Sequence, residues 1–239
     1  MTLSNDRMGL RDQLQIGQRE LSTRFRNSPP RTIGAGKLLT AGIRSKAAIC
    51  HLVAGWACQS RELSDGHQAI LDIYLPGDVI GLDSVLRTRA LNNVLTLTSI
   101  AVEAIDAEDA ILDLMTCRST ALYIAWLLGQ RQRRADRLLA AISSLDARRR
   151  LAAMLFDFYE RLSRRGLVTG STYNLPMKQT HIAAYLGLTV AHVNRVLRSL
   201  REERIANVEK HAVTIFDVQG LKRLARDTRI AAAAGKDAA

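Results

Sequence analysis

The chain has 239 residues, 47% of them hydrophobic, and only four prolines, so it can bury ordinary cores and is not expected to be globally disordered. Its formal net charge of +11 is uneven: residues 1–117 hold 12 Lys and Arg against 13 Asp and Glu, whereas residues 118–239 hold 22 against 10. A near-neutral first half joined to a basic second half favours a polyanion-binding module attached to another domain, although basic helices also bind membranes or only maintain solubility.

No targeting or membrane segment is evident. The start, MTLSNDRMGLRDQ, has charges where a signal peptide needs its apolar run, and no stretch of about 18 apolar residues occurs. We therefore expect a cytoplasmic protein without a membrane partner. Cys50, Cys58 and Cys117 are odd in number and lack CxxC spacing, so reduced thiols are expected. No metal site, cofactor or catalytic residue is predicted.

The first half divides into a polar start and a β-rich region. The chain is polar up to Pro29-Pro30, and residues 1–29 are interpreted as a partly ordered N-terminal arm with a weakly helical run. Residues 30–117 are predicted to form a sensor barrel. Its β-branched runs are separated by turn signals and cover residues 47–63, 67–81 and 93–106. Repeated short strands at this spacing are typical of a small all-β barrel or jelly roll.

After residue 117 the hydrophobic period changes from two to about 3.5, the heptad spacing of a coiled coil. The apolar positions of this seam are Ala121, Ile124, Leu128, Ala135, Leu138 and Ile142, with Arg131 as a polar interruption. The helix could pack on its own barrel or pair with the same helix of a second copy. The length of the seam favours a dimerisation helix over residues 118–143, and Ser143-Ser144 is a candidate hinge.

Residues 144–230 are predicted to form a DNA-binding domain, which begins with an amphipathic helix from Asp146 to Arg164. The low-complexity end AAAAGKDAA, residues 231–239, is predicted to be a disordered tail.

The stretch QTHIAAYLGLTVAHVNRVLRSL, residues 179–200, has the spacing of a helix-turn-helix motif. Gly187 can adopt the positive φ that ends the first helix, and Thr189 is a favourable N-cap for the second. The apolar residues that hold the two helices together are Ile182, Ala183, Leu186, Leu188, Val193 and Val196. Because this motif places its second helix in the major groove, double-stranded DNA is the predicted partner.

The polar face of the second helix carries the predicted base contacts. Arg195 can donate two hydrogen bonds to guanine, Asn194 can pair with adenine, and Ala191 can touch a thymine methyl group. His192 is a weaker candidate for a base or phosphate contact.

Further basic and polar residues around the motif are predicted to contact phosphates. They are Lys178, Thr180, Arg198 and Arg201. Arg198 and Arg201 are equally well interpreted as surface residues paired with Glu202. The β-prone stretch IANVEKHAVTIFD, residues 205–217, predicts a hairpin wing with Lys210 at its tip, against phosphate.

Two stretches carry a resemblance to a known family: LSDGHQAILDIYLPGDVIGLDS, residues 63–84, and LTVAHVNRVLRSLREERI, residues 188–205. They are similar to the sensor-barrel strand, with its PGD-x-x-G turn, and to the recognition helix of the Crp/Fnr family of bacterial transcription regulators. The resemblance extends over residues 30–228. It implies an α+β fold with an N-terminal β jelly-roll barrel of the cyclic-nucleotide-binding type, a long dimerisation helix and a C-terminal winged helix-turn-helix domain. It also implies a homodimer on a palindromic site, DNA bending and recruitment of RNA polymerase, since the catabolite activator of this family is a standard example of both motif and bend.

The sensor region departs from the family pattern. Cyclic-nucleotide-binding members hold the phosphate with an Arg-Ser pair, and here Asn92-Asn93 stand about where that pair would fall. A buried phosphate without a cation is costly, so cAMP binding of the family type is not expected. The remaining candidates for an effector pocket are Gly81, Asp83, Ser84, Arg87 and Arg89, of which either arginine could replace the missing cation.

Other departures concern cofactors and base readout. Iron–sulfur members need four cysteine ligands and this chain has three, so no such cluster is expected. Haem stays formally open through His51 and His67, which are more readily interpreted as ordinary strand or loop residues. Many members carry a glutamate four residues before the recognition arginine, where this chain has Ala191. Because alanine cannot accept a hydrogen bond from cytosine, we predict a DNA site that differs from the family consensus at that base pair.

Three alternatives stay open beside a homodimeric, sequence-specific regulator. The first is a cyclic-nucleotide-responsive regulator of the same fold, and the second is an architectural DNA binder without sequence preference. The third is a cupin-type jelly-roll enzyme, which would need an HxH motif that the chain lacks.

Overall fold

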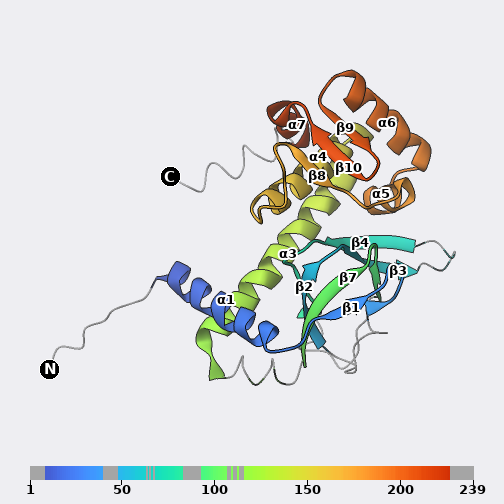
Figure 1. Ribbon diagram of the computed structural model, residues 1–239. Coiled ribbons are helices and arrows are strands. Elements are labelled where there is room, and N and C mark those ends of the chain that lie inside the picture. The colour runs from blue at the N-terminus through green and yellow to red at the C-terminus, as the bar shows by residue number, and fades with distance from the viewer. Residues whose placement is uncertain are drawn as a thin grey trace. The chain divides into compact units, whose positions relative to one another are not determined.

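The computed structural model describes residues 9–39, 48–62, 64, 66, 68–82, 93–106, 109, 112 and 116–226. These residues form two compact units (Figure 1). The first contains the described residues of Met1–Gln59 and Ile73–Arg134, and the second those of Ser60–Asp72 and Ala135–Ala239.

Two β-sheets build the first half of the chain. One sheet has the strand order β1-β7-β2-β5 with antiparallel neighbours, and it consists of β1 (Arg31–Ile33), β2 (Ala48–Ala54), β5 (Val79–Ile80) and β7 (Ile100–Asp106). The other has the order β4-β3-β6 and consists of β3 (Ala57–Glu62), β4 (Gln68–Tyr74) and β6 (Asn93–Thr96). The predicted α+β fold with an N-terminal β-region is confirmed, and the described strands form two sheets rather than a closed barrel.

The four-stranded sheet contributes side chains to a hydrophobic cluster on each of its faces. Successive residues of a strand point to opposite faces, so neighbouring residues of β2 belong to different clusters. On β2, Cys50 and Leu52 join the core between the two sheets, together with Tyr74 of β4. Ile49, which directly precedes Cys50, points to the other face and packs in a second cluster. That cluster consists of Leu21, Phe25, Ile49, Leu82 and Ile124, so helices cover the outer face of the sheet.

Helix α1 (Leu10–Arg26) is an integral part of the first unit, in contrast to the partly ordered arm predicted for residues 1–29. Its Leu21 and Phe25 are each only 2% exposed. Figure 1 shows α1, in blue, crossing the first turns of helix α3 (Arg118–Ser144), in green. The crossing requires a residue without a side chain, since a Cβ atom on Gly17 would lie 2.0 Å from the carbonyl oxygen of Ser119.

Helix α3 matches the predicted long helix of residues 118–143 to within one residue. In the first unit, the seam that predicted a dimer contact is partly used within the chain itself. Ile124 is 4% exposed in the helix–sheet cluster, and Leu128 packs against that cluster. Arg131 donates to Gln59 Oε1 and lies 5.9 Å from the centre of the Tyr74 ring. The interpretation of a helix packed on its own sheets therefore holds for this part of the seam.

The second unit contains seven elements after the end of α3. They are α4 (Ala147–Ser163), β8 (Thr172–Asn174), α5 (Gln179–Leu186), α6 (Val190–Glu202), β9 (Ala206–Glu209), β10 (Ala212–Ile215) and α7 (Val218–Ala225). The three strands form an antiparallel sheet in the order β8-β10-β9. The predicted helix from Asp146 to Arg164 is confirmed, with these two residues as its caps.

Helix α4 forms the core of this unit. Its Leu151, Leu155 and Phe158 have no exposed surface, and Phe158 stacks on Tyr185 of α5 with 6.3 Å between ring centres. Residues 231–239, predicted as a disordered tail, lie outside the described residues. Within the described ranges, none of the helices has the length and apolar character needed to cross a bilayer.

Candidate nucleic-acid interface

Short-range signals fix the angle between α5 and α6. Gly187 ends α5 with a φ of 63°, a conformation that other residues adopt only with strain. The N–H of Leu188 donates to the Ala183 carbonyl at 3.0 Å, which closes the turn. Thr189 Oγ1 then accepts from the N–H of His192 at 3.2 Å and caps α6. The predicted roles of Gly187 and Thr189 as helix cap residues are confirmed.

The buried face of α6 holds the helix on the domain. Val193 and Leu200 have no exposed surface and Val196 is 9% exposed, while Ile182 and Leu186 are buried on α5. The opposite face of α6 is exposed, and it carries Ala191, His192, Asn194, Arg195 and Arg198. The structure thus brings all the predicted base-contacting residues together on one accessible surface.

The cationic side chains of this surface are available for an anionic ligand. In the described part of the chain, no carboxylate pairs with the guanidinium groups of Arg195, Arg198 or Arg201. The carboxylate that accepts bonds at the end of α6 is that of Glu203, from Ser199 Oγ at 2.7 Å and from Arg148. The predicted pairing of Glu202 with these arginines is therefore not found.

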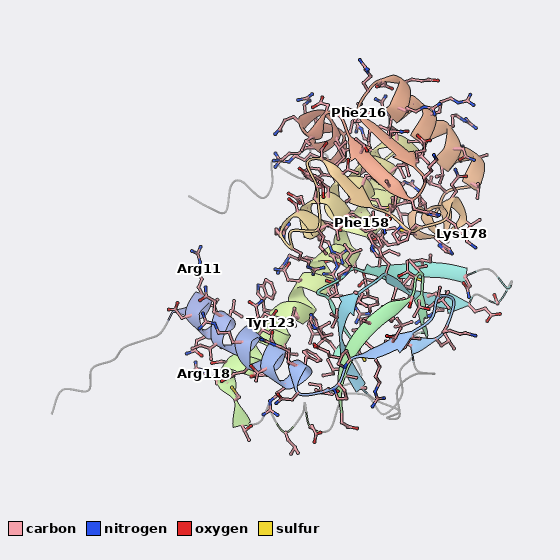
Figure 2. All side chains as sticks on the ribbon, in the orientation of Figure 1. Arg11, Arg118, Tyr123, Phe158, Lys178 and Phe216 are labelled. Carbon is pink, nitrogen blue, oxygen red and sulfur yellow. The ribbon has the colours of Figure 1, made fainter. Side chains whose placement is uncertain are left out.

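The start of α5 carries two of the predicted phosphate contacts. Lys178, which Figure 2 labels, and Thr180 are both exposed, as predicted for phosphate contacts. The N–H of Lys178 donates to Nδ1 of His181 at 3.3 Å. Burial, and secondarily the charge of Lys178, lower the pKa of His181, which keeps the ring neutral and able to accept this bond.

The predicted wing is a hairpin of β9 and β10, in which Glu209 pairs with Ala212. Lys210 and His211 form its two-residue turn with φ values of 49° and 65°, and both side chains are exposed. Two consecutive positive φ angles are typical of the tight turns that match the twist of a hairpin. Lys210 lies at the tip of the hairpin, as predicted from the sequence.

The sequence interpretation missed the third strand of this sheet, β8. Thr172 pairs with Thr214 of β10, and the hydroxyl of the buried Tyr173 donates to the Leu155 carbonyl at 2.8 Å. Burial raises the pKa of Tyr173 well above its usual value. The signal was a short β-prone run between Gly170 and Pro176, which was too short to stand out by periodicity. The sequence interpretation also missed the contacts of Arg148, Arg150 and Glu203, because no local pattern indicates which residues these side chains bond to.

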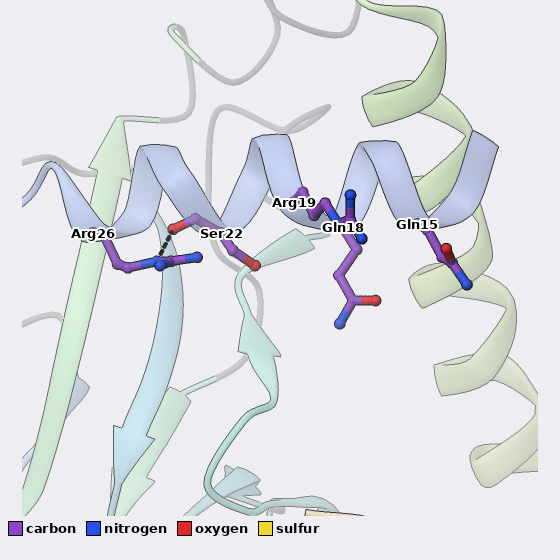
Figure 3. A pocket seen from close by; sticks show the side chains of 5 residues that line it. All are labelled: Gln15, Gln18, Arg19, Ser22 and Arg26. Atoms are coloured by element: carbon purple, nitrogen blue, oxygen red, sulfur yellow. Dashed lines mark hydrogen bonds between the residues drawn. The ribbon is translucent and has the colours of Figure 1, made fainter. Parts of the chain in front are cut away.

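The first unit gives a partial view of the candidate effector pocket. Of its five residues, Gly81 is described, with a φ of 85°, whereas the rest lie outside the described residues: Asp83, Ser84, Arg87 and Arg89. The PGD turn before Gly81 is a structural element, because the buried Asp78 accepts from the N–H of Leu75 at 2.8 Å. A hollow beside α1 is lined by Gln15, Gln18, Arg19, Ser22 and Arg26, and Figure 3 shows Arg26 Nε donating to the Ser22 carbonyl.

The histidine and cysteine residues of the first unit have structural surroundings. His51 Nδ1 lies 3.0 Å from Glu103 on the neighbouring strand, and its ring packs on Phe25. Cys50 and Cys58 are buried free thiols, whereas Cys117 is half-buried and donates to Glu20 at 2.6 Å. His67 lies outside the described residues.

Comparison with known proteins identifies the family. Residues 149–224 match the model of the Crp-like helix-turn-helix domain. The chain is 31% identical over 165 residues to the nitrogen fixation regulation protein FixK of Rhizobium meliloti, a match that covers 69% of this chain and 72% of FixK. This chain belongs to the Crp/Fnr family.

The chain is also similar to other regulatory proteins. The transcriptional regulatory protein Btr of Bordetella pertussis is 26% identical over 165 residues, which cover 68% of this chain and 67% of Btr. In three anaerobic regulatory proteins, the chain spans only 60–62% of the length of the relative. The structure of FixK2 from Bradyrhizobium japonicum has a TM-score of 0.71 at 20% identity, covering 84% of this chain and 98% of FixK2, which shows a shared fold.

Proposed function

We propose that this Crp/Fnr protein is a sequence-specific DNA-binding transcription regulator that acts as a homodimer on a palindromic site. The observation that carries the proposal is the exposed polar face of α6. The opposite face of this helix is buried and is fixed by Val193, Val196 and Leu200. A helix held in this way presents its N-terminal half to the major groove in helix-turn-helix proteins.

The chemistry of the exposed α6 face fits base readout. Arg195 can donate two hydrogen bonds to guanine and Asn194 can form a pair with adenine, while Ala191 can only make an apolar contact. Arg198, Arg201, Lys178 and Thr180 surround this surface as phosphate contacts. Lys210 at the tip of the wing adds a further phosphate contact away from α6.

Helix α3 is proposed to form the dimer contact through a face that the chain itself leaves open. Trp126 is 41% exposed, Ala125 is exposed, and Leu122 and Gly129 are partly exposed. These residues recur three and four apart, and because Ala125 has only a methyl group and Gly129 has no side chain, two helices can approach closely here. The predicted seam residues beyond the first unit, Ala135, Leu138 and Ile142, lie at the helical spacing of Ile124 and Leu128, on the opposite side of α3, so they would have to form a separate contact. In such a dimer the two α6 helices lie one DNA turn apart, about 34 Å.

We further propose that the regulator works without family-type cAMP binding and without an iron–sulfur cluster. Burial raises the pKa of Cys50 to about 12 and that of Cys58 to about 11, which disfavours the thiolates that ligate iron. Cys117 is the one remaining thiol. RNA polymerase is proposed as a partner on the family resemblance, and DNA remains the primary one.

The test begins with selection of bound sequences from random duplex DNA, which is expected to return a palindrome. Affinities for that site and for random DNA are then measured for Arg195→Ala and Lys210→Ala, which each remove one positive charge. Arg195→Ala should cost about 1–3 kcal/mol on the selected site and relax preference at one base pair, whereas Lys210→Ala should weaken all sequences alike.

Other results would change the conclusion. Equal losses on selected and random DNA for Arg195→Ala would remove its assignment as a base contact. Salt-dependent binding without any selected sequence would favour an architectural DNA binder. Heat released on titration with cAMP or cGMP, together with tighter DNA binding, would favour the cyclic-nucleotide-responsive alternative.

A further inference from the structure

The start of α4 lies where three helices of the second unit meet. The predicted hinge, Ser143-Ser144, forms the last two residues of α3. Only Leu145 and Asp146 separate α3 from α4. Asp146 caps α4 by accepting from the N–H of Arg149 at 2.8 Å. Three consecutive arginines then occupy the first turn, at positions 148, 149 and 150. On a helix, consecutive residues point in different directions, so these three side chains can reach different neighbours.

Arg150 joins the end of α3 to the end of α5. Its Nε donates to the Leu145 carbonyl at 2.8 Å, and its Nη1 donates to the Leu186 carbonyl at 3.3 Å. Leu186 is the last residue of α5, where carbonyl groups have no partner within the helix and a cation is favourable. A Cβ atom on Gly187 would lie 3.9 Å from Ile142 of α3 and 4.0 Å from Arg150 Nη1, so all three groups meet at the turn before α6.

Arg148 reaches the other end of the helix-turn-helix motif. Its Nη2 donates to Glu203 Oε2, and Glu203 is the residue that ends α6. The hydrogen bond from Ser199 and then the charge of Arg148 lower the pKa of Glu203. Both partners of this ion pair are partly exposed, with side-chain exposures of 37% and 43%. Solvent-exposed pairs contribute little to folding free energy, so the contact matters for geometry rather than for stability.

We propose that Arg148 and Arg150 are positioning residues that fix the orientation of the recognition helix to the joint between α3 and α4. This inference rests on the proposed DNA-binding function. One guanidinium holds the end of α5 and the other holds the end of α6, and both belong to a single helical turn of α4. A rotation of α4 about the joint therefore moves both motif helices together. Base readout needs this precision, because bidentate contacts tolerate displacements of only about 0.5 Å.

The test compares Arg150→Lys with Arg149→Lys, and both variants retain the net charge. Lysine cannot bridge two carbonyl groups as the planar guanidinium does. Arg149 is the matched control, because its side chain is exposed and its ion pair is with the neighbouring Asp146, at 3.7 Å. We expect Arg150→Lys to lower the ratio of selected-site to random-DNA affinity by about tenfold, as for loss of one charge-assisted hydrogen bond, with little change for Arg149→Lys. Affinity for random DNA should stay unchanged in both.

The second arm tests Arg148 and Glu203 by a double-mutant cycle with Arg148→Gln, Glu203→Gln and the double variant. If the pair positions α6, the double variant should lose no more selectivity than either single variant, which signals coupling between the two residues. Independent, additive losses of selectivity would overturn the role of this pair.

Hydrogen exchange of the free protein separates failure of this inference from failure of the proposed function. Backbone amides of α5 and α6 should exchange faster in Arg150→Lys than in Arg149→Lys, a result that does not depend on DNA. Equal exchange in the two variants would overturn the positioning role. If the amides of α5 and α6 exchange faster in Arg150→Lys but the ratio of selected-site to random-DNA affinity is unchanged, the role of Arg150 in base readout is also overturned. A wild-type protein without sequence preference would refute the proposed function and the role in readout, and exchange alone would then show whether Arg150 restrains the two helices.

Discussion

Replacement of Gly17 by alanine should destabilise the first unit, although the same change in most helices is stabilising. Alanine is preferred over glycine in a helix interior by about 1 kcal/mol. At position 17, however, the new Cβ atom would lie 2.0 Å from the Ser119 carbonyl oxygen and 2.8 Å from Tyr123 Cβ. Both atoms belong to the backbone or the base of a side chain on α3, so neither can move aside by rotation. Helix α1 has to withdraw instead.

The size of the effect follows from this withdrawal. Restoring a separation that Cβ atoms tolerate requires α1 to shift by about 1 Å, enough to lose roughly a quarter to a half of the dispersion energy at the contact. Overpacked sites of this kind typically cost about 1–3 kcal/mol. Since Leu21 and Phe25 on α1 lose packing at the same time, we expect a net loss of about 1–2 kcal/mol after the helix-propensity gain.

Urea unfolding followed by tryptophan fluorescence measures this change, because the two tryptophans of the chain, Trp56 and Trp126, both lie in the first unit. The control is the difference between Gln18→Ala and Gln18→Gly at the exposed neighbouring position of α1, where alanine should be more stable by about 1 kcal/mol. If alanine at position 17 raises the free energy of unfolding by the same amount, the close crossing of α1 and α3 is refuted.

Two further predictions concern titrating groups. Because the pKa of His181 is lowered on folding, the unfolded chain binds the proton first, and the free energy of unfolding should fall as pH decreases below about 6.5. His181→Gln, which keeps an acceptor for the Lys178 N–H, should reduce this slope in urea unfolding followed by circular dichroism, and identical slopes would contradict the assignment. Iodoacetamide at pH 8 should label Cys117 alone in the native protein, because pKa values of about 12 and about 11 leave Cys50 and Cys58 protonated. Mass spectrometry of the modified peptides checks this, and labelling of either buried thiol at the rate of Cys117 would argue against their burial.

The amino-acid sequence alone was sufficient to predict the helix-turn-helix motif and the exposed polar face of α6. Gly187 and Thr189 act through hydrogen bonds between residues at most five apart, and the spacing of Val193 and Val196 fixes which face of α6 is buried. Such features depend on local geometry alone, so they can be recognised without knowledge of the fold. The hairpin with Lys210 at its tip was predictable for the same reason.

Which partner each buried face meets became clear from the folded structure alone. The heptad period of α3 correctly indicated a long helix with an apolar side, but Ile124 covers the chain's own sheet, as the alternative interpretation allowed. In the same way, nothing in the sequence distinguishes Gly17 from a helix-weakening residue, or Arg150 from the exposed Arg149 beside it. Periodicity reports that a side chain is removed from water, whereas its partner is set by contacts between residues far apart in the chain, which no local pattern encodes.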